Sequence, residues 1–312
     1  MSSADNAIEQ HPITRAPARR RIALGPGVAL GALGILGFSF SLPATRLAVD
    51  GLDPWLVAFG RATVAAVLAA GYLSATRAPR PRRGQLASLA IVAAGVVVGF
   101  PLCTSLALQG ETAAHGAVVI GLLPAATAVA AVVRAGERPS RAFWAASGAG
   151  LVAVLAFIAA TSGADLRGHG PQAGDLLLLG GTALCAIGYA EGGALSRDLG
   201  GPATISWALV LAAPVTAAVS VVSALSTDPA HAGTTAWLGF AYVSVVSMFL
   251  GFFAWYAGLA RGGVARVGQV QLAQPVLTLG WSALLLGEPV GPGTVVTALA
   301  VLACVAATQR AR

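Results

Sequence analysis

Two stretches of the chain repeat one another: PAATAVAAVVRAGE at residues 124–137 and PVLTLGWSALLLGE at residues 275–288. Both follow the pattern Pro-x2-Thr-x8-Gly-Glu, and the second begins 151 positions after the first (from 124 to 275). The same offset superimposes residues outside this pattern: Gly37 on Gly188, Arg46 on Arg197 and Leu108 on Leu259. One constant offset shared by proline, threonine, glycine, glutamate and arginine predicts an internal duplication.

The composition excludes a soluble protein. The 312 residues are 56% hydrophobic and only 10% charged, with a mean hydropathy of +0.78. A soluble domain carries about a quarter charged residues. At about 20 apolar residues for each membrane crossing, the chain has room for about ten crossings and little else. Its apolar runs are continuous rather than alternating, which excludes a closed β-barrel.

Ten apolar segments have the length, about 18–25 residues, that spans a bilayer. They lie at 24–45, 54–75, 86–108, 114–133, 141–162, 174–195, 203–224, 235–259, 264–286 and 291–308. The sequence therefore predicts an all-α polytopic membrane protein with ten transmembrane helices. Residues 1–22 are predicted to be a disordered cytoplasmic tail, 23–162 a first five-helix repeat and 174–308 a second one.

The basic residues indicate the orientation. All 19 are arginine, and with a cytoplasmic N-terminus sixteen of them fall in cytoplasmic stretches. Only Arg46 and Arg167 fall outside, while Arg61 lies within the second segment. This bias is a membrane topology signal rather than a nucleic-acid-binding patch, and it places both termini in the cytoplasm. Because each half has an odd number of crossings, the second half is expected to be inverted, as in many transporters.

The ten segments, the five-plus-five duplication and the pattern that closes the fourth and ninth segments resemble the drug/metabolite transporter superfamily, and within it the EamA family. An arginine in the second helix, here Arg61, is also typical of the family. The resemblance covers residues 24–308. It implies a bacterial inner-membrane carrier, commonly an exporter of amino acids or other small metabolites. The first segment departs from the family, because GFSFSLPATR stands at 37–46 where members often carry tryptophan and a residue such as asparagine.

Two charged residues lie inside apolar segments. A charge such as that of Arg61 costs about 2.5–3.5 kcal/mol at the bilayer centre. Arg61 is interpreted as a contact for an anion, such as a substrate carboxylate, or as a guanidinium bonded to carbonyls and hydroxyls of neighbouring helices. Glu191, in GYAEGG at 188–193, is interpreted as a protonatable gate or cation contact, or as an interfacial carboxylate that snorkels or pairs with Arg197.

The ninth segment carries a polar stripe. Its members are spaced i, i+3, i+7 and i+11 and share one helical face: Gln271, Gln274, Thr278 and Ser282. Trp281 lies beside the stripe, and Trp255 lies on a similar line of the eighth segment. The stripe is interpreted as a cavity wall, with interhelical hydrogen bonding as the alternative. The predicted substrate-binding residues are Arg61, Glu191, Trp255, Gln271, Gln274, Thr278 and Trp281.

The duplicated residues are given structural roles. Glu137 and Glu288 are predicted to bind loop amides or a helix N-terminus. Pro124 and Pro275 are predicted to break backbone bonds inside their helices and to expose carbonyls to a cavity, with a simple packing kink as the alternative. Small residues four apart are predicted to allow close helix packing, in the pairs Gly27/Gly31 and Gly95/Gly99.

Neither a metal nor a cofactor is expected. His115 lacks an acidic or cysteine partner at ligand spacing and is expected to be solvated. The three cysteines are expected to be small buried residues: Cys103, Cys185 and Cys304. Nucleotide-binding loops, GxSxG and HExxH patterns are absent from the sequence. We therefore expect no catalytic residues and no enzyme activity, and any pumping must use an ion or substrate gradient.

The function predicted from these features is a secondary carrier that exports small polar or amphipathic metabolites by alternating access. Its expected partners are a small metabolite and the lipid bilayer, without nucleic acid; self-association as a homodimer stays open. A flippase for a lipid-linked substrate is the alternative. An intramembrane enzyme would need clustered ionisable residues at one depth, which Arg61 and Glu191 do not provide.

Overall fold

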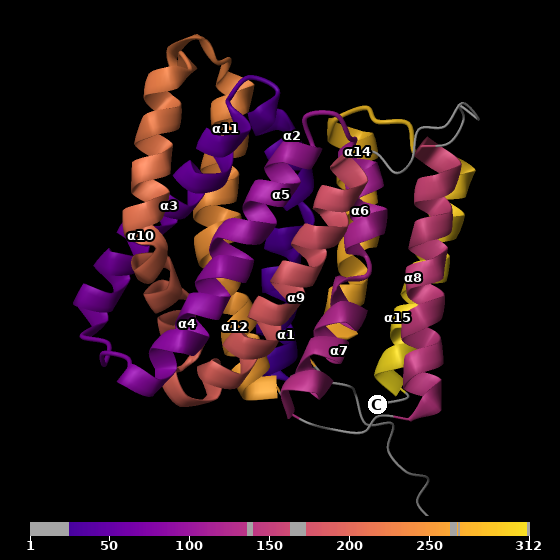
Figure 1. Ribbon diagram of the computed structural model, residues 1–312, viewed down its shortest axis with the longest axis horizontal. Helices are drawn as coiled ribbons and strands as arrows, with labels where there is room; N and C mark the ends of the chain where they lie inside the picture. Colours follow the sequence, from indigo (N-terminus) through magenta and orange to yellow (C-terminus); the bar gives the residue numbers. More distant parts are fainter. Residues whose placement is uncertain (1–24, 136–139, 163–172, 263–266, 268, 311–312) are drawn as a thin grey trace, which may run out of the picture.

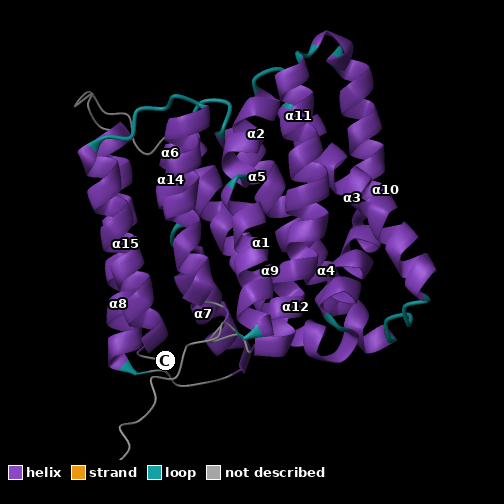
Figure 2. Cartoon of the chain, turned by 180° about the vertical axis from the view of Figure 1, so that it is seen from behind, coloured by secondary structure: helices purple, strands orange, loops and turns teal. Residues whose placement is uncertain are grey.

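The computed structural model describes residues 25–135, 140–162, 173–262, 267 and 269–310. These residues form helices and connecting turns, and none of them lies in a β-strand. The helices run side by side, with the turn between α10 (Gly201–Ser226) and α11 (Thr234–Tyr242) at one end of the molecule and the C-terminal end of α15 (Pro292–Arg310) at the other (Figures 1 and 2). The predicted all-helical fold class is confirmed.

The described helices begin and end close to the predicted segments. In the first half they are α1 (Pro26–Ser39), α2 (Ser41–Val49), α3 (Pro54–Thr76), η1 (Arg83–Gln85), α4 (Leu86–Val92), η2 (Ala93–Gly99), α5 (Phe100–Ala107), α6 (Ala113–Ile120), α7 (Leu123–Ala135) and α8 (Arg141–Ser162). In the second half they are α9 (Ala173–Leu199), α10 (Gly201–Ser226), η3 (Pro229–His231), α11 (Thr234–Tyr242), η4 (Val243–Gly251), α12 (Phe252–Gly262), η5 (Gln269–Leu272), α14 (Ala273–Leu285) and α15 (Pro292–Arg310).

Seven helical stretches are long and apolar enough to cross a membrane. They are Pro26–Val49, Pro54–Thr76, Arg83–Ala107, Ala113–Arg134, Ala173–Leu199, Gly201–Ser226 and Thr234–Arg261. Three further apolar helices are shorter: Arg141–Ala156, Val270–Leu285 and Pro292–Ala307. The chain is therefore a multi-span membrane protein.

Irregular helical turns recur at the offset of the duplication. The π-helical stretch η2 begins at Ala93, and η4 begins at Val243. When the offset of 151 is added, every residue of η2 falls on a residue of η4. The α6–α7 break at Gly121 likewise falls on Leu272, where η5 gives way to α14. π-helical turns within α-helices frequently lie at functional sites. The helix α9 has no counterpart of the break at Phe40 that separates α1 from α2.

Glycines allow the central helices to approach closely. A Cβ atom on Gly258 of α12 would lie 2.7 Å from the Gly31 nitrogen and 2.9 Å from the Gly27 oxygen of α1. Gly95 of η2 packs in the same way against the backbone of Leu184 in α9. The predicted packing role of these glycine pairs is confirmed. The helices α8 and α15 pack on each other at one edge of the bundle, and α3 packs on α10 toward the opposite edge (Figures 1 and 2).

The cysteines differ from the prediction in their burial. Cys185 is buried, whereas Cys103 and Cys304 are only half-buried, and no disulfide joins the three. The prediction of burial is therefore wrong for these two, although Cys103 faces Gly181 of α9 and Cys304 faces Gly150 of α8.

Candidate functional site

Two helix breaks create the candidate site. Proline has no backbone N–H. A proline inside a helix therefore leaves the carbonyl four residues earlier without its hydrogen-bond donor. In a regular helix the carbonyl of Ile120 would bond residue 124 and that of Gln271 would bond residue 275, and both positions are proline. The structure accordingly ends α6 at Ile120, before Pro124, and ends η5 at Leu272, before Pro275. The predicted breaks in both helices are confirmed.

A hollow lies where the two breaks meet. Its empty space is about 270 Å³ when the opening to solvent is counted, and in this conformation its enclosed part has room for no more than about one water molecule. It is lined by Leu42, Ala117, Ile120, Leu123, Pro124, Gln271, Gln274, Pro275 and Thr278. These residues come from α2, α6 and α7 in the first half of the chain and from η5 and α14 in the second. Both halves therefore contribute to one site.

Three of the predicted substrate-binding residues line this hollow: Gln271, Gln274 and Thr278. Gln271 is 4% exposed, and its Nε2 atom has no hydrogen-bond partner among the described residues. The Thr278 hydroxyl donates to the carbonyls of Ser39, at 2.7 Å, and of Gln274, at 2.9 Å. The stripe thus combines both interpretations, because Thr278 bonds across to α1 while Gln271 keeps an unused donor. Substrate binding by these side chains stays a prediction.

Trp281 and Trp255 lie outside the lining of the hollow. The Trp281 indole donates to the Ser39 hydroxyl at 3.0 Å and so helps to hold α14 against α1. Trp255 is 2% exposed and packs with its ring centroid 6.4 Å from Phe38 and 6.3 Å from Tyr189.

An aromatic cluster surrounds Trp255 and was not anticipated from the sequence. It joins α1, α9 and α12 through Phe38, Tyr189, Phe252, Trp255 and Tyr256. The ring of Phe252 lies 4.8 Å from that of Phe38 and 6.0 Å from that of Tyr189. Three members share one face of α12 at the spacing i, i+3 and i+4, namely Phe252, Trp255 and Tyr256, so periodicity could have found them. Their contacts with Phe38 and Tyr189 depend on helix packing, for which the sequence carries no signal.

Arg61 is buried in the interior of the bundle. It is 3% exposed, and its Nε atom has no hydrogen-bond partner in the part of the chain that the structure describes. Its guanidinium lies within electrostatic reach of the Cys185 thiol in α9. It does not line the hollow. Its two interpretations, a substrate contact or a structural guanidinium, both stay open.

Glu191 is 6% exposed and joins three helices near one end of α9. Its carboxylate accepts hydrogen bonds from Arg134 Nε at 2.7 Å and Nη2 at 3.2 Å, and from the Ser88 hydroxyl at 2.5 Å. The suggested pairing with Arg197 is therefore wrong. Arg134 lies 57 positions before Glu191 in the sequence, and only the packing of α7 on α9 brings the two side chains together.

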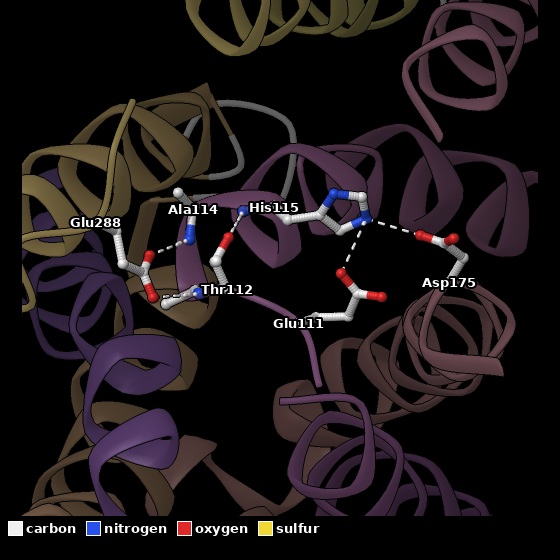
Figure 3. A network of polar contacts seen from close by, with 7 residues as sticks. Glu111, Thr112, Ala114, His115, Asp175 and Glu288 are labelled. Carbon is white, nitrogen blue, oxygen red and sulfur yellow. Dashed lines mark hydrogen bonds and ion pairs between the residues drawn. The ribbon is translucent and has the colours of Figure 1, made fainter. Parts of the chain in front are cut away.

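His115 forms a second polar contact near the other end of α9 (Figure 3). Its Nε2 atom lies 2.7 Å from Asp175 Oδ1 and 3.9 Å from Glu111 Oε2, and its side chain is only 11% exposed. The expectation that His115 is solvated and lacks an acidic partner is therefore wrong. The spacing of four residues from Glu111 was a usable signal, whereas Asp175 lies 60 positions away and approaches only because α9 begins beside α6.

Burial raises the pKa of Glu111 above its ordinary value of 4.5. The His115 side chain opposes this shift of the pKa, and the Asp175 carboxylate adds to it. The two carboxylates therefore repel one another across the histidine.

Glu288 caps the N-terminus of α6. Its two carboxylate oxygens accept the backbone N–H groups of Ala113, at 2.9 Å, and Ala114, at 2.8 Å (Figure 3). The Thr112 side chain accepts the N–H of His115 at 3.0 Å. The predicted role of Glu288 at a helix N-terminus is confirmed. Glu137 lies outside the described residues.

The chain is similar to known membrane transporters. The model of the EamA-like transporter family matches the chain twice, over residues 25–159 and 172–308. The uncharacterized transporter YdeK of Bacillus subtilis (strain 168) is 48% identical over 280 residues, which cover 90% of this chain and 96% of that protein. A solved crystal structure that is 20% identical shares the fold, with a TM-score of 0.61 over 92% of this chain and 99% of its own.

Proposed function

Since the chain belongs to the EamA-like transporter family, we propose that it is a secondary transporter of the bacterial inner membrane that exports amino acids or other small polar or amphipathic metabolites by alternating access. The hollow at the two helix breaks carries this proposal. It combines apolar walls with the unused Nε2 donor of Gln271 and with two lining residues, Ile120 and Gln271, whose carbonyls lose their helical donors. A few polar groups in an apolar pocket are typical of a small-molecule site.

The proposed topology has ten crossings in two inverted repeats of five, with both termini in the cytoplasm. The three shorter apolar helices complete this count beside the seven long ones. The recurrence of the π-helical stretches and of the helix breaks at one offset supports the duplication. Substrate sites of inverted-repeat transporters lie near the midplane between the repeats, at discontinuous helices.

Alternating access requires each end of the carrier to open in turn. The helix α9 is joined to the first half at both ends, to α7 through Glu191 and Arg134 and to α6 through Asp175 and His115. In the proposed topology the first contact lies on the cytoplasmic side and the second on the outer side. Opening toward either side would separate the contact on that side, while the substrate stays at the break between α6 and α7.

The proposed partners are a small metabolite and the lipid bilayer, and self-association as a homodimer stays a prediction. No catalytic step is proposed.

Export is tested by growth of an overexpressing strain on a panel of toxic amino acids and their analogues. Wild-type protein should raise tolerance to at least one compound, and Gln271→Leu should lose that tolerance at equal membrane abundance. The lipid-facing Leu284→Ala, at a residue 78% exposed, is the matched control and should behave as wild type. Unchanged tolerance across the panel, or full tolerance with Gln271→Leu, would contradict the proposal.

A further inference from the structure

The contact between α6 and α9 contains the elements of a metal site. Glu111, His115 and Asp175 each offer one ligand atom, and these atoms all lie within 4.8 Å of one another (Figure 3). The side chains are 15%, 11% and 0% exposed, respectively, so the group is largely withdrawn from water. We propose that Glu111, His115 and Asp175 bind a divalent transition-metal ion, with Zn²⁺ as the best match.

The chemistry of the three side chains selects the class of ion. Imidazole suits zinc and other first-row transition metals, whereas sites for calcium and magnesium are built from oxygen atoms. Zn²⁺ accepts one imidazole nitrogen and two carboxylate oxygens, and sites with three protein ligands leave a fourth position for water. One histidine with two carboxylates fits such an open site.

The distances require only a small adjustment. Zinc bonds of about 2.0–2.2 Å place tetrahedral ligand atoms about 3.3–3.6 Å apart. The separation of His115 Nε2 from Asp175 Oδ1 is 2.7 Å, and that from Glu111 Oε2 is 3.9 Å. The His115–Asp175 distance has to lengthen and the His115–Glu111 distance has to shorten, each by less than about 1 Å. Small rotations of the side chains supply these changes.

The backbone around the group is held in place independently of any ion. Glu288 binds the amides of Ala113 and Ala114, and the Thr112 side chain binds that of His115. These bonds fix the start of α6, from which His115 projects.

The charges also favour a cation. Asp175 is fully buried, and its carboxylate repels that of Glu111. A divalent ion between them would replace this repulsion with attraction to both. The positive ends of α6 and α9 lie nearby and oppose a cation, so the two carboxylates are both needed. The ion would join α6 to α9 in the same place as the His115–Asp175 contact.

Binding is tested on the full-length protein in detergent, purified with a tag that contains no histidine and stripped with a chelator. Titration calorimetry with Zn²⁺ should show one ion per chain, and an excess of Mg²⁺ should not displace it. Added Zn²⁺ should raise the unfolding temperature. Co²⁺ in place of Zn²⁺ should give the strong visible absorption of a four- or five-coordinate ion.

Variants locate the site. His115→Ala and Glu111→Gln should each weaken Zn²⁺ binding by at least about tenfold. Asp175→Asn should do the same; if its full burial prevents folding, the Glu111 variant decides. The control is His231→Ala, because His231 lies 2.9 Å from Asp228 in an exposed pair outside this cluster, and it should bind as wild type.

The proposal is overturned if wild-type protein takes up no Zn²⁺, or if His115→Ala and Glu111→Gln bind it as tightly as wild type. An equal loss in His231→Ala would also overturn it, because binding would then not be local. None of these measurements involves transport, so their failure leaves the proposed carrier function untouched.

Discussion

Arg61 is unusual for a membrane helix, because its guanidinium is withdrawn from water inside the bundle. It is 3% exposed, and its repeat counterpart at the offset of 151 is Ala212. An arginine that both halves needed for folding would be expected in both. The unshared position, with an Nε atom that no described residue binds, favours a role in the transport cycle.

Arg61→Gln should nearly abolish transport while the protein still reaches the membrane, because removing a buried charge relieves its desolvation cost. Arg61→Lys should impair transport more than folding, since lysine keeps the charge but loses the planar two-pronged geometry that fits a carboxylate. Transport and membrane abundance are measured side by side. Wild-type transport by Arg61→Gln would exclude a substrate contact, and loss of inserted protein would indicate a structural one.

Glu111 gives a pH dependence of stability. Its pKa in the folded protein is raised above the ordinary 4.5, so the folded state keeps a proton that the unfolded state has already lost. The stability that this proton provides is fully present below the ordinary pKa and is lost as pH rises through the raised pKa. Glu111→Gln is neutral throughout and escapes this loss.

The measurement is the unfolding temperature of wild type and Glu111→Gln between acidic and neutral pH, with a chelator present to exclude metal ions. The difference should move in favour of the variant as pH rises above about 4.5. A constant difference, or a shift in favour of wild type, would contradict the raised pKa. Added Zn²⁺ should reverse the order at neutral pH if the metal site exists.

At the scale of the element, α6 depends on a cap from a distant part of the chain. Glu288→Ala leaves the N–H groups of Ala113 and Ala114 without their acceptor, and loss of an N-terminal cap typically costs about 0.5–2 kcal/mol. Glu288→Gln keeps one acceptor and should lose less. Unfolding temperatures in detergent measure both. Equal stability of Glu288→Ala and wild type would show that water replaces the cap.

Helix positions and breaks were largely predictable from the sequence. The second segment was predicted at 54–75 and is observed at Pro54–Thr76, because an apolar run flanked by Asp53 and Arg77 has clear ends. Pro124 and Pro275 gave the two breaks, since each removes a helical donor. Proline alone is not a sufficient signal, because α10 continues through Pro214. The break at Phe40 carries the same marker, because Pro43 stands four residues after Ser39, the last residue of α1, but it was not predicted.

Contacts between helices were not predictable in the same way. Periodicity identifies one face of one helix, so it placed Gln271, Gln274 and Thr278 together. It contains no information on which helix lies opposite. The partners of Glu191 and His115 therefore had to come from the structure, where α9 packs beside both α6 and α7.

At the scale of the whole molecule, orientation follows from the arginine bias. Reporter fusions after residues 80 and 168 should report the cytoplasm and the outer side, respectively, because arginine-rich connections stay in the cytoplasm. The first position lies in the α3–α4 connection, which holds Arg77, Arg80, Arg82 and Arg83. The opposite result at either position would contradict the proposed orientation.

Alternating access between the two halves requires that water and substrate can enter the hollow from each side of the membrane in turn. Gln274 is half-buried and lines it, while Val276 on the same helix is 51% exposed on the apolar outer surface of the bundle. These two positions on α14 provide a site and its matched control.

The most direct test is the reaction of Gln274→Cys, in a protein without its native cysteines, with a charged thiol reagent that does not cross membranes. The cysteine should react when the reagent is added to right-side-out vesicles and also when it is added to inverted ones, while Val276→Cys stays unreactive in both. An unreactive Gln274→Cys in both preparations of folded protein would contradict a water-filled path through the hollow. Reaction from one side alone would contradict alternating access.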